Sequence, residues 1–174
     1  LDHHISESKL PNIYSIVNPN RFDENNYLNN LAAVGVTFLF IMGLRKILRE
    51  RNYFNKEKKE PNLLNFLDLV ALGTICDVVN LDKYNRNLVI KGLEILKQRK
   101  NISLKKMIDN SHLNHSPSSK DLAFIIGPQL NSASRIDDSS LSSKLLITNK
   151  IEEIEIISKK LILLNEKRKI IENS

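Results

Sequence analysis

The sequence predicts an α/β protein that is mainly helical, with few strands and a long final helix. Residues 13–17 form a short apolar run closed by an Asn-Pro-Asn turn, which is typical of a strand. In most later segments apolar residues recur at the spacing of one helix face. The last such segment, 151–171, carries a narrow apolar stripe on a largely charged rod. A helix of this kind can bridge to another domain.

The expected elements follow one another with short polar breaks. The helix expected at 27–51 is apolar all round in its middle, so we place it at the centre of the core. Pro61 starts a second buried helix, and Asp82 can cap a third one. The remaining expectations are short helices at 101–110 and 119–130 and a polar segment at 131–140.

Composition limits the function classes. The formal net charge of +6 permits a polyanionic partner, because a basic surface attracts one over a Debye length of about 8–10 Å. Solvated lysines from biased composition explain the charge equally well. The one cysteine, Cys76, excludes a disulfide framework and favours a reducing cytoplasm, with the thiol as a small buried group. The longest apolar run, 31–44, is shorter than the ~20 residues that span a bilayer, so we expect no membrane association.

The chain opens on Leu1 followed directly by Asp2-His3-His4, and we therefore expect it to be part of a longer protein. Neutral imidazole binds divalent metals well, and a neighbouring carboxylate can orient the ring. Side chains alternate along extended chain, so one histidine can face a metal and the other a phosphate. Taken alone, terminal histidines are more often exposed than ligating.

Two further positions carry candidate chemistry. Asp77 lies in an apolar run, 74–79, where a carboxylate needs a partner such as a metal; a helix cap or a salt bridge is the alternative. In the segment 127–138, small residues permit close approach of a ligand, and Arg135 can grip a phosphate with its planar guanidinium. A helix-ending turn with a surface arginine is the alternative there. His112 and His115 are expected in a surface loop.

Together these segments resemble the RecJ-type single-stranded-DNA exonuclease family of the DHH phosphoesterase superfamily. The resemblance covers essentially the whole chain. It is carried by the Asp-His-His triplet, an aspartate motif and an Asn/Arg motif, with shorter similar stretches between them. The matching segments are residues 2–4, 17–20, 33–38, 67–79 with 81–82 and 85–86, and 127–138.

The resemblance implies a 5′-to-3′ exonuclease of DNA repair and recombination that uses Mn²⁺ or Mg²⁺. It implies His3 and Asp77 as metal ligands and His4 as a phosphate-binding catalytic group, with Asp2 supporting it. Arg135, helped by Asn131, would contact the DNA backbone. Single-stranded DNA is the implied substrate, and a single-strand-binding protein or a helicase an implied partner.

The same resemblance implies a partial DHH catalytic domain at 1–148, the C-terminal part of a parallel-sheet domain. Residues 149–174 would form a linker helix toward a DHH-associated domain. The family's upstream aspartate motifs are not in this sequence, and Ser134 and Asn80 replace a usual Gly and Pro. We therefore expect weak metal affinity and no useful nuclease activity from the 174-residue chain. Two alternatives are a phosphoesterase acting on short oligonucleotides or cyclic dinucleotides, and a non-catalytic nucleic-acid-binding remnant.

Overall fold

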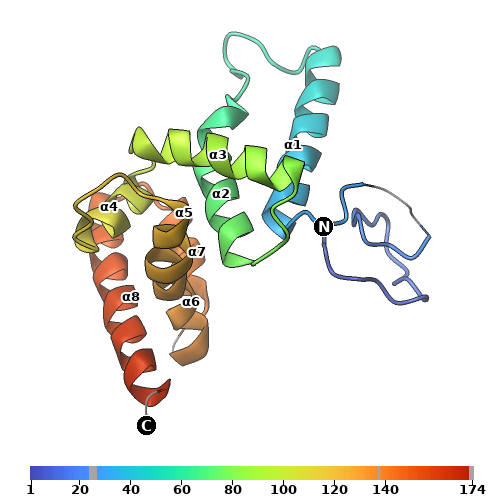
Figure 1. Ribbon diagram of the computed structural model, residues 1–174. Helices are drawn as coiled ribbons and strands as arrows, with labels where there is room; N and C mark the ends of the chain where they lie inside the picture. Colours follow the sequence, from blue (N-terminus) through green and yellow to red (C-terminus); the bar gives the residue numbers. More distant parts are fainter. Residues whose placement is uncertain (24–26, 137, 173–174) are drawn as a thin grey trace. The chain divides into compact units, whose positions relative to one another are not determined.

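The computed structural model describes residues 1–23, 27–136 and 138–172. Within these ranges the regular elements are all helical, so the mainly helical character is confirmed, whereas the expected few parallel strands are not found. The chain divides into two compact units, Leu1–Gly92 and Leu93–Ser174, with the boundary inside one helix (Figure 1). Each unit has its own packing.

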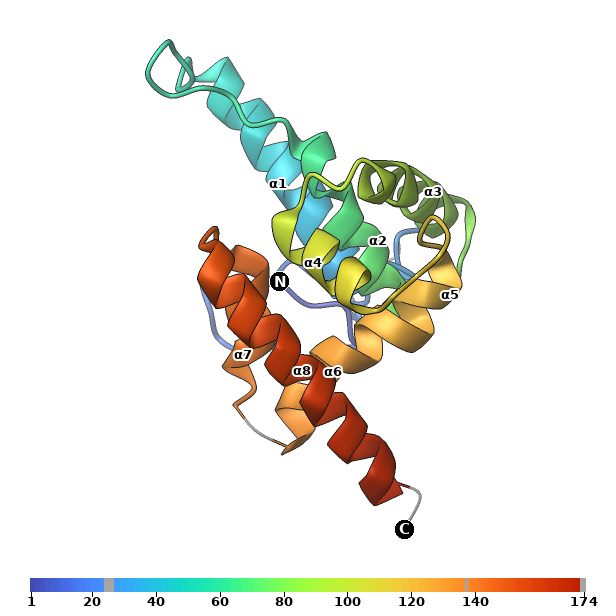
Figure 2. The ribbon, with the colours of Figure 1, turned by 90° about the vertical axis from the view of Figure 1, so that its left-hand side faces the viewer.

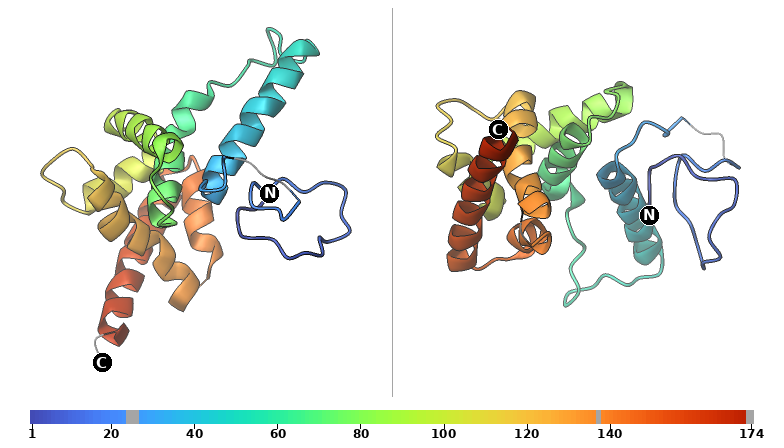
Figure 3. Two further views of the ribbon diagram at one scale, coloured as in Figure 1. Left: turned by 45° about the vertical axis from the view of Figure 1, so that its right-hand side comes forward. Right: turned by 90° about the horizontal axis from the view of Figure 1, so that it is seen from below.

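The strand expected at residues 13–17 is irregular chain (Figure 3). Two backbone hydrogen bonds, from Asp2 N–H to Val17 O (3.0 Å) and from Ser6 N–H to Asn20 O (3.1 Å), tie this region to the N-terminal residues. They do not form a continuous ladder. Tyr14 is fully exposed, so no buried face fixes a register. An apolar run thus fails to form a strand because it lacks both a paired neighbour and a surface to cover.

The first unit is built on helices α1 (Ala33–Glu50) and α2 (Leu67–Cys76), with a 3₁₀ turn η1 (Leu63–Phe66) leading into α2. The prediction that α1 is buried along its middle is wrong. Its buried residues lie near its start, where α2 packs on it. Farther along α1, several apolar side chains are exposed: Leu39, Phe40, Ile41, Met42, Leu44 and Ile47.

Helix α3 (Lys83–Lys97) begins as the sequence predicts. Asp82 Oδ1 accepts hydrogen bonds from the N–H groups of Tyr84 (2.9 Å) and Asn85 (3.0 Å), which confirms it as a cap. These bonds lower the pKa of Asp82, with Asn85 as the largest cause. The buried Asn85 side chain donates to Asn30 O and Asn80 O, both at 2.7 Å. It thereby joins the chain before α1 to the chain before α3.

The second unit packs around α8 (Ile151–Glu172), which contacts α4, α6 and α7 (Figure 2). The other helices of this unit are α4 (Ile102–Asn110), α5 (Ser119–Asp121), the π-helical turn η2 (Leu122–Ile126), α6 (Gly127–Ile136) and α7 (Ser140–Ile147). The side chains of Leu122, Ile126, Leu145 and Leu161 are fully buried there. Among the described residues, no helix combines the length and the apolar character that crossing a membrane requires.

The polar segment expected at 131–140 is helical through Ile136, and α7 follows it. Ser132 is fully buried, and its hydroxyl lies 2.6 Å from Gln129 O and 3.1 Å from Leu161 O. Ala133 is also fully buried. Small residues thus form the face of α6 that packs on α8, and the Ser132 hydroxyl finds backbone carbonyl partners within this packing. The sequence alone predicts only a polar segment here.

Candidate metal and nucleic-acid site

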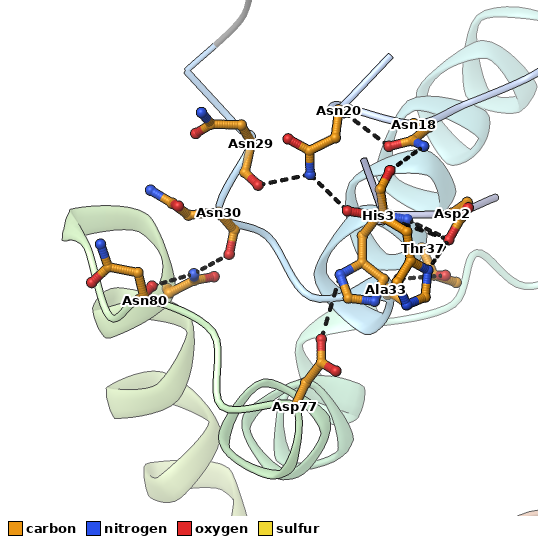
Figure 4. Close-up of polar contacts among 12 residues, drawn as sticks. Asp2, His3, Asn18, Asn20, Asn29, Asn30, Ala33, Thr37, Asp77 and Asn80 are labelled. Carbon is orange, nitrogen blue, oxygen red and sulfur yellow. Dashed lines mark hydrogen bonds and ion pairs between the residues drawn. The ribbon is translucent and has the colours of Figure 1, made fainter. Parts of the chain in front are cut away.

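His3 and Asp77 lie side by side in the first unit, although they are far apart in the sequence. His3 Nδ1 is 3.5 Å from Asp77 Oδ2 (Figure 4). The His3 side chain is 16% exposed and that of Asp77 is 37% exposed. Both side chains therefore reach one partly solvated spot, as the binding of one metal ion by both residues would require.

Asp77 is positioned by the end of α2. Its N–H donates to Gly73 O at 3.0 Å, and Asp77 itself is the C-cap residue. The next residue, Val78, has φ 56°, a left-handed conformation that β-branched residues rarely adopt. Glycine usually occupies this position after a helix. The chain thus accepts local strain directly beside the candidate ligand.

We expect Val78→Gly to raise the free energy of unfolding by about 1 kcal/mol, because relief of strain outweighs the added freedom of the unfolded chain. Val78 is 87% exposed, so little packing is lost. Asn52→Gly is the control, since Asn52 has φ 54° but asparagine tolerates this region. Urea unfolding of both variants measures the difference. Equal effects at the two positions would mean that Val78 is not strained.

Two asparagines hold the backbone of the histidine pair. Asn18 Nδ2 donates to His4 O at 2.9 Å, and Asn20 Nδ2 donates to His3 O at 2.6 Å. Asn20 N–H in turn donates to Asn18 Oδ1 at 2.8 Å, which links the Asn18 side chain to the backbone of Asn20. From the sequence, Asn18 and Asn20 are expected to form a turn, within a segment, 17–20, that resembles part of the RecJ family. The Asn-Pro-Asn sequence predicts a rigid turn. It does not predict that the two asparagine side chains bind the backbone of His3 and His4.

Asp2 and His4 form a separate, more exposed pair. His4 Nδ1 is 2.8 Å from Asp2 Oδ1, which also accepts from the His3 and His4 N–H groups. The hydrogen bond from the His4 side chain, followed by that from His3 N–H, lowers the pKa of Asp2 to about 2. The His4 side chain is 77% exposed. Asp2 is thus an ionised carboxylate that orients the His4 ring.

The Asn/Arg motif lies in the second unit, on α6. Asn131 and Arg135 are one helical turn apart and both exposed, so they share a face. Arg135 Nη1 donates to Glu172 Oε1 at 3.2 Å. Asp137, at the end of this motif, lies outside the described residues. His115 is 61% exposed, in keeping with the loop expected for it.

His3 and Asp77 supply some, but not all, of the donor groups that a divalent ion needs. One imidazole nitrogen and one carboxylate suit Mn²⁺, and also Mg²⁺ through the carboxylate. Burial, with a contribution from the charge of Asp77, raises the pKa of the Cys76 thiol to about 11, so at neutral pH it is not a thiolate. Among the described residues, no cluster of three or more histidine, cysteine, aspartate or glutamate side chains could hold an ion. His3 and Asp77 therefore fit as part of a ligand set.

Sequence comparison gives one consistent relationship, although no family model matches the chain. The chain is 39% identical to the single-stranded-DNA-specific exonuclease RecJ of Salmonella typhimurium and 38% identical to that of Escherichia coli. Both matches cover 98% of the chain. The chain is similar to one part of RecJ over almost its whole length. It spans about 30% of the length of these RecJ proteins.

Solved RecJ structures agree with this relationship. A crystal structure of exonuclease RecJ bound to manganese matches 99% of the chain, with a TM-score of 0.81 at 28% identity. The chain covers 41% of that protein. RecJ from Thermus thermophilus, in complex with Mn²⁺ or Mg²⁺, matches 80% of the chain with a TM-score of 0.67. The helical fold described above is therefore that of one part of RecJ.

Proposed function

We propose that this chain supplies part of the active site of a metal-dependent 5′-to-3′ single-stranded-DNA exonuclease of DNA repair and recombination. The contact between His3 and Asp77 carries the proposal, because it joins the two residues that the RecJ resemblance assigns to the metal. RecJ structures with Mn²⁺ and Mg²⁺ support these ions as cofactors. We also propose that the protein acts in the cytoplasm. A single-strand-binding protein or a helicase is its proposed partner.

Each residue then has a defined role. His3 and Asp77 would hold a divalent ion, which supplies polarisation of the phosphate and a lower pKa for a bound water. His4, oriented by Asp2, would contact the scissile phosphate. Arg135 and Asn131 would bind the DNA backbone through charge-assisted hydrogen bonds. Residues 1–148 would be the C-terminal part of a DHH domain, and 149–174 the helix that leads to the next domain.

A graft tests this function. The matching segment of Escherichia coli RecJ is replaced by this chain, and mononucleotide release from 5′-phosphorylated single strands is measured with Mn²⁺. We expect activity in the graft and none in the 174-residue chain alone, since two donors do not complete a metal site. Asp77→Asn in the graft should lower release at least about a hundredfold, because groups that merely orient a ligand already contribute ~10–100-fold.

Asp109→Asn in the graft is the matched control, since Asp109 is an exposed carboxylate paired with Arg99. A graft that folds like its parent but is inactive would contradict the proposal. Preferential hydrolysis of dinucleotides over long single strands would favour the short-oligonucleotide alternative. Robust release by the 174-residue chain alone would refute the expectation that its ligand set is incomplete.

A further inference from the structure

Arg135 shares its carboxylate partner with a second arginine. Arg135 Nη1 on α6 donates to Glu172 Oε1 at 3.2 Å. Arg168 Nη1 on α8 lies 2.7 Å from both oxygens of the same carboxylate. All three residues belong to the second unit. Two guanidinium groups from neighbouring helices thus converge on one negative charge.

Arg168 is held in place before any ligand arrives. Its Nε donates to Oδ1 of Asn165 at 3.2 Å, and Asn165 is buried. The Arg168 side chain is only 19% exposed, compared with 59% for Arg135. A cation that is already ordered loses less side-chain freedom on binding an anion.

The carboxylate between the arginines has the properties of a displaceable occupant. Guanidinium groups bind carboxylates and phosphates through the same parallel hydrogen bonds. Glu172 is 48% exposed, and exposed ion pairs contribute little free energy. It also follows Arg168 by one helical turn, and this acid-after-base order is the less favourable one in a helix.

We infer that Arg168 is a second phosphate-binding residue beside Arg135, and that Glu172 occupies this site until a backbone phosphate of single-stranded DNA displaces it. The inference rests on the proposed function only in taking Arg135 as a DNA contact. A purely structural network, in which Glu172 fastens α8 to α6, is the competing explanation. The two explanations predict different effects on DNA affinity. Removing the charge of Glu172 strengthens DNA binding if Glu172 occupies a phosphate site, and does not strengthen it if Glu172 only fastens α8 to α6.

The test uses the 174-residue chain and a fluorescent 5′-phosphorylated oligothymidylate, without divalent metal, with binding followed by anisotropy. Glu172→Gln should tighten binding about threefold to fivefold, the equivalent of one exposed ion pair. Glu166→Gln, which removes the same charge from an exposed position on α8, is the control and should change affinity less. Equal effects of the two variants would overturn the inference.

Arg168→Ala should weaken binding roughly tenfold, as expected for loss of a charge-assisted hydrogen bond. The dependence of log affinity on log salt should become shallower by about 0.7, which is the value for one phosphate contact on a single strand. In the Arg168→Ala background, Glu172→Gln should give a smaller gain than in the unchanged chain. An unchanged salt slope in Arg168→Ala, with helicity retained by circular dichroism, would overturn the role of Arg168.

Arg135→Ala separates this inference from the proposed function. If Arg135→Ala weakens binding while the Glu172 and Arg168 variants have no effect, the inference fails and the assignment of Arg135 stands. If Arg135→Ala has no effect but Glu172→Gln and Arg168→Ala behave as expected, the phosphate site stands on Arg168 and the role proposed for Arg135 fails. If the unchanged chain does not bind the oligonucleotide, both fail.

Discussion

We expect Gly92→Ala to lower the free energy of unfolding by about 3 kcal/mol, the upper end of what overpacking a core typically costs. A Cβ atom at Gly92 would lie 2.2 Å from Leu67 O and 2.4 Å from Ala71 Cβ. The first of these is a backbone oxygen, so the contact can be relieved only by moving α3 away from α2. The higher helix propensity of alanine, worth about 1 kcal/mol, offsets only part of this cost.

Gly43→Ala is the matched control, because Gly43 lies within α1 and a Cβ there meets nothing within 4 Å. It should raise the free energy of unfolding by about 0.5–1 kcal/mol through helix propensity alone. Urea unfolding followed by circular dichroism measures both variants. If the two substitutions shift stability in the same direction, the close approach of α3 to α2 is not as described.

The packing of α2 on α1 explains part of the candidate site. Asp77 ends α2, and α2 packs on α1 on one side while α3 lies against its Leu67–Ala71 turn at Gly92. The α3 contact lies in the first part of α2, and the part nearer Asp77 is held by α1, because a Cβ atom at Gly73 would lie 2.7 Å from Val34 Cγ1. Functional groups held by packed helices keep their geometry better than groups held by loops.

The sequence revealed the helices with clear periodicity and the residues with strong local chemistry. Asp82 caps α3 as predicted, because a cap depends only on neighbouring residues. The pairing of His3 with Asp77 was expected from the RecJ resemblance and not from spacing. Periodicity cannot show that a residue before the first helix meets the end of the second.

Other features depended on tertiary context that no local pattern contains. The apolar residues of α1 predicted burial, but burial requires a partner surface, and most of those beyond Phe38 are exposed. The residues from Asn131 onward predicted a polar segment after the helix, but Ser132 is part of α6 and its hydroxyl is satisfied where α6 packs on α8. Asn18 and Asn20 hold the histidine backbone through contacts between segments 14 and 17 residues apart, which no local pattern encodes.

Asp77→Asn should weaken Mn²⁺ binding by the 174-residue chain at least about tenfold, and His3→Ala should do the same. Asparagine keeps the shape of the side chain but removes the charge, so any loss reports the carboxylate as a ligand. Stability should change by about 1 kcal/mol or less, because a partly solvated His–Asp pair contributes little. The fraction of free Mn²⁺, followed by electron paramagnetic resonance, gives the affinity.

Asp109→Asn removes one exposed carboxylate from the other unit and therefore controls for net charge. If His3 and Asp77 bind one ion, the double variant should be no weaker than either single variant, since both act on the same site. Additive losses would instead mean two independent weak sites. Mn²⁺ binding that Asp77→Asn and Asp109→Asn reduce equally would show only general attraction to negative charge, and the 3.5 Å contact between His3 and Asp77 would then be an ordinary surface pair.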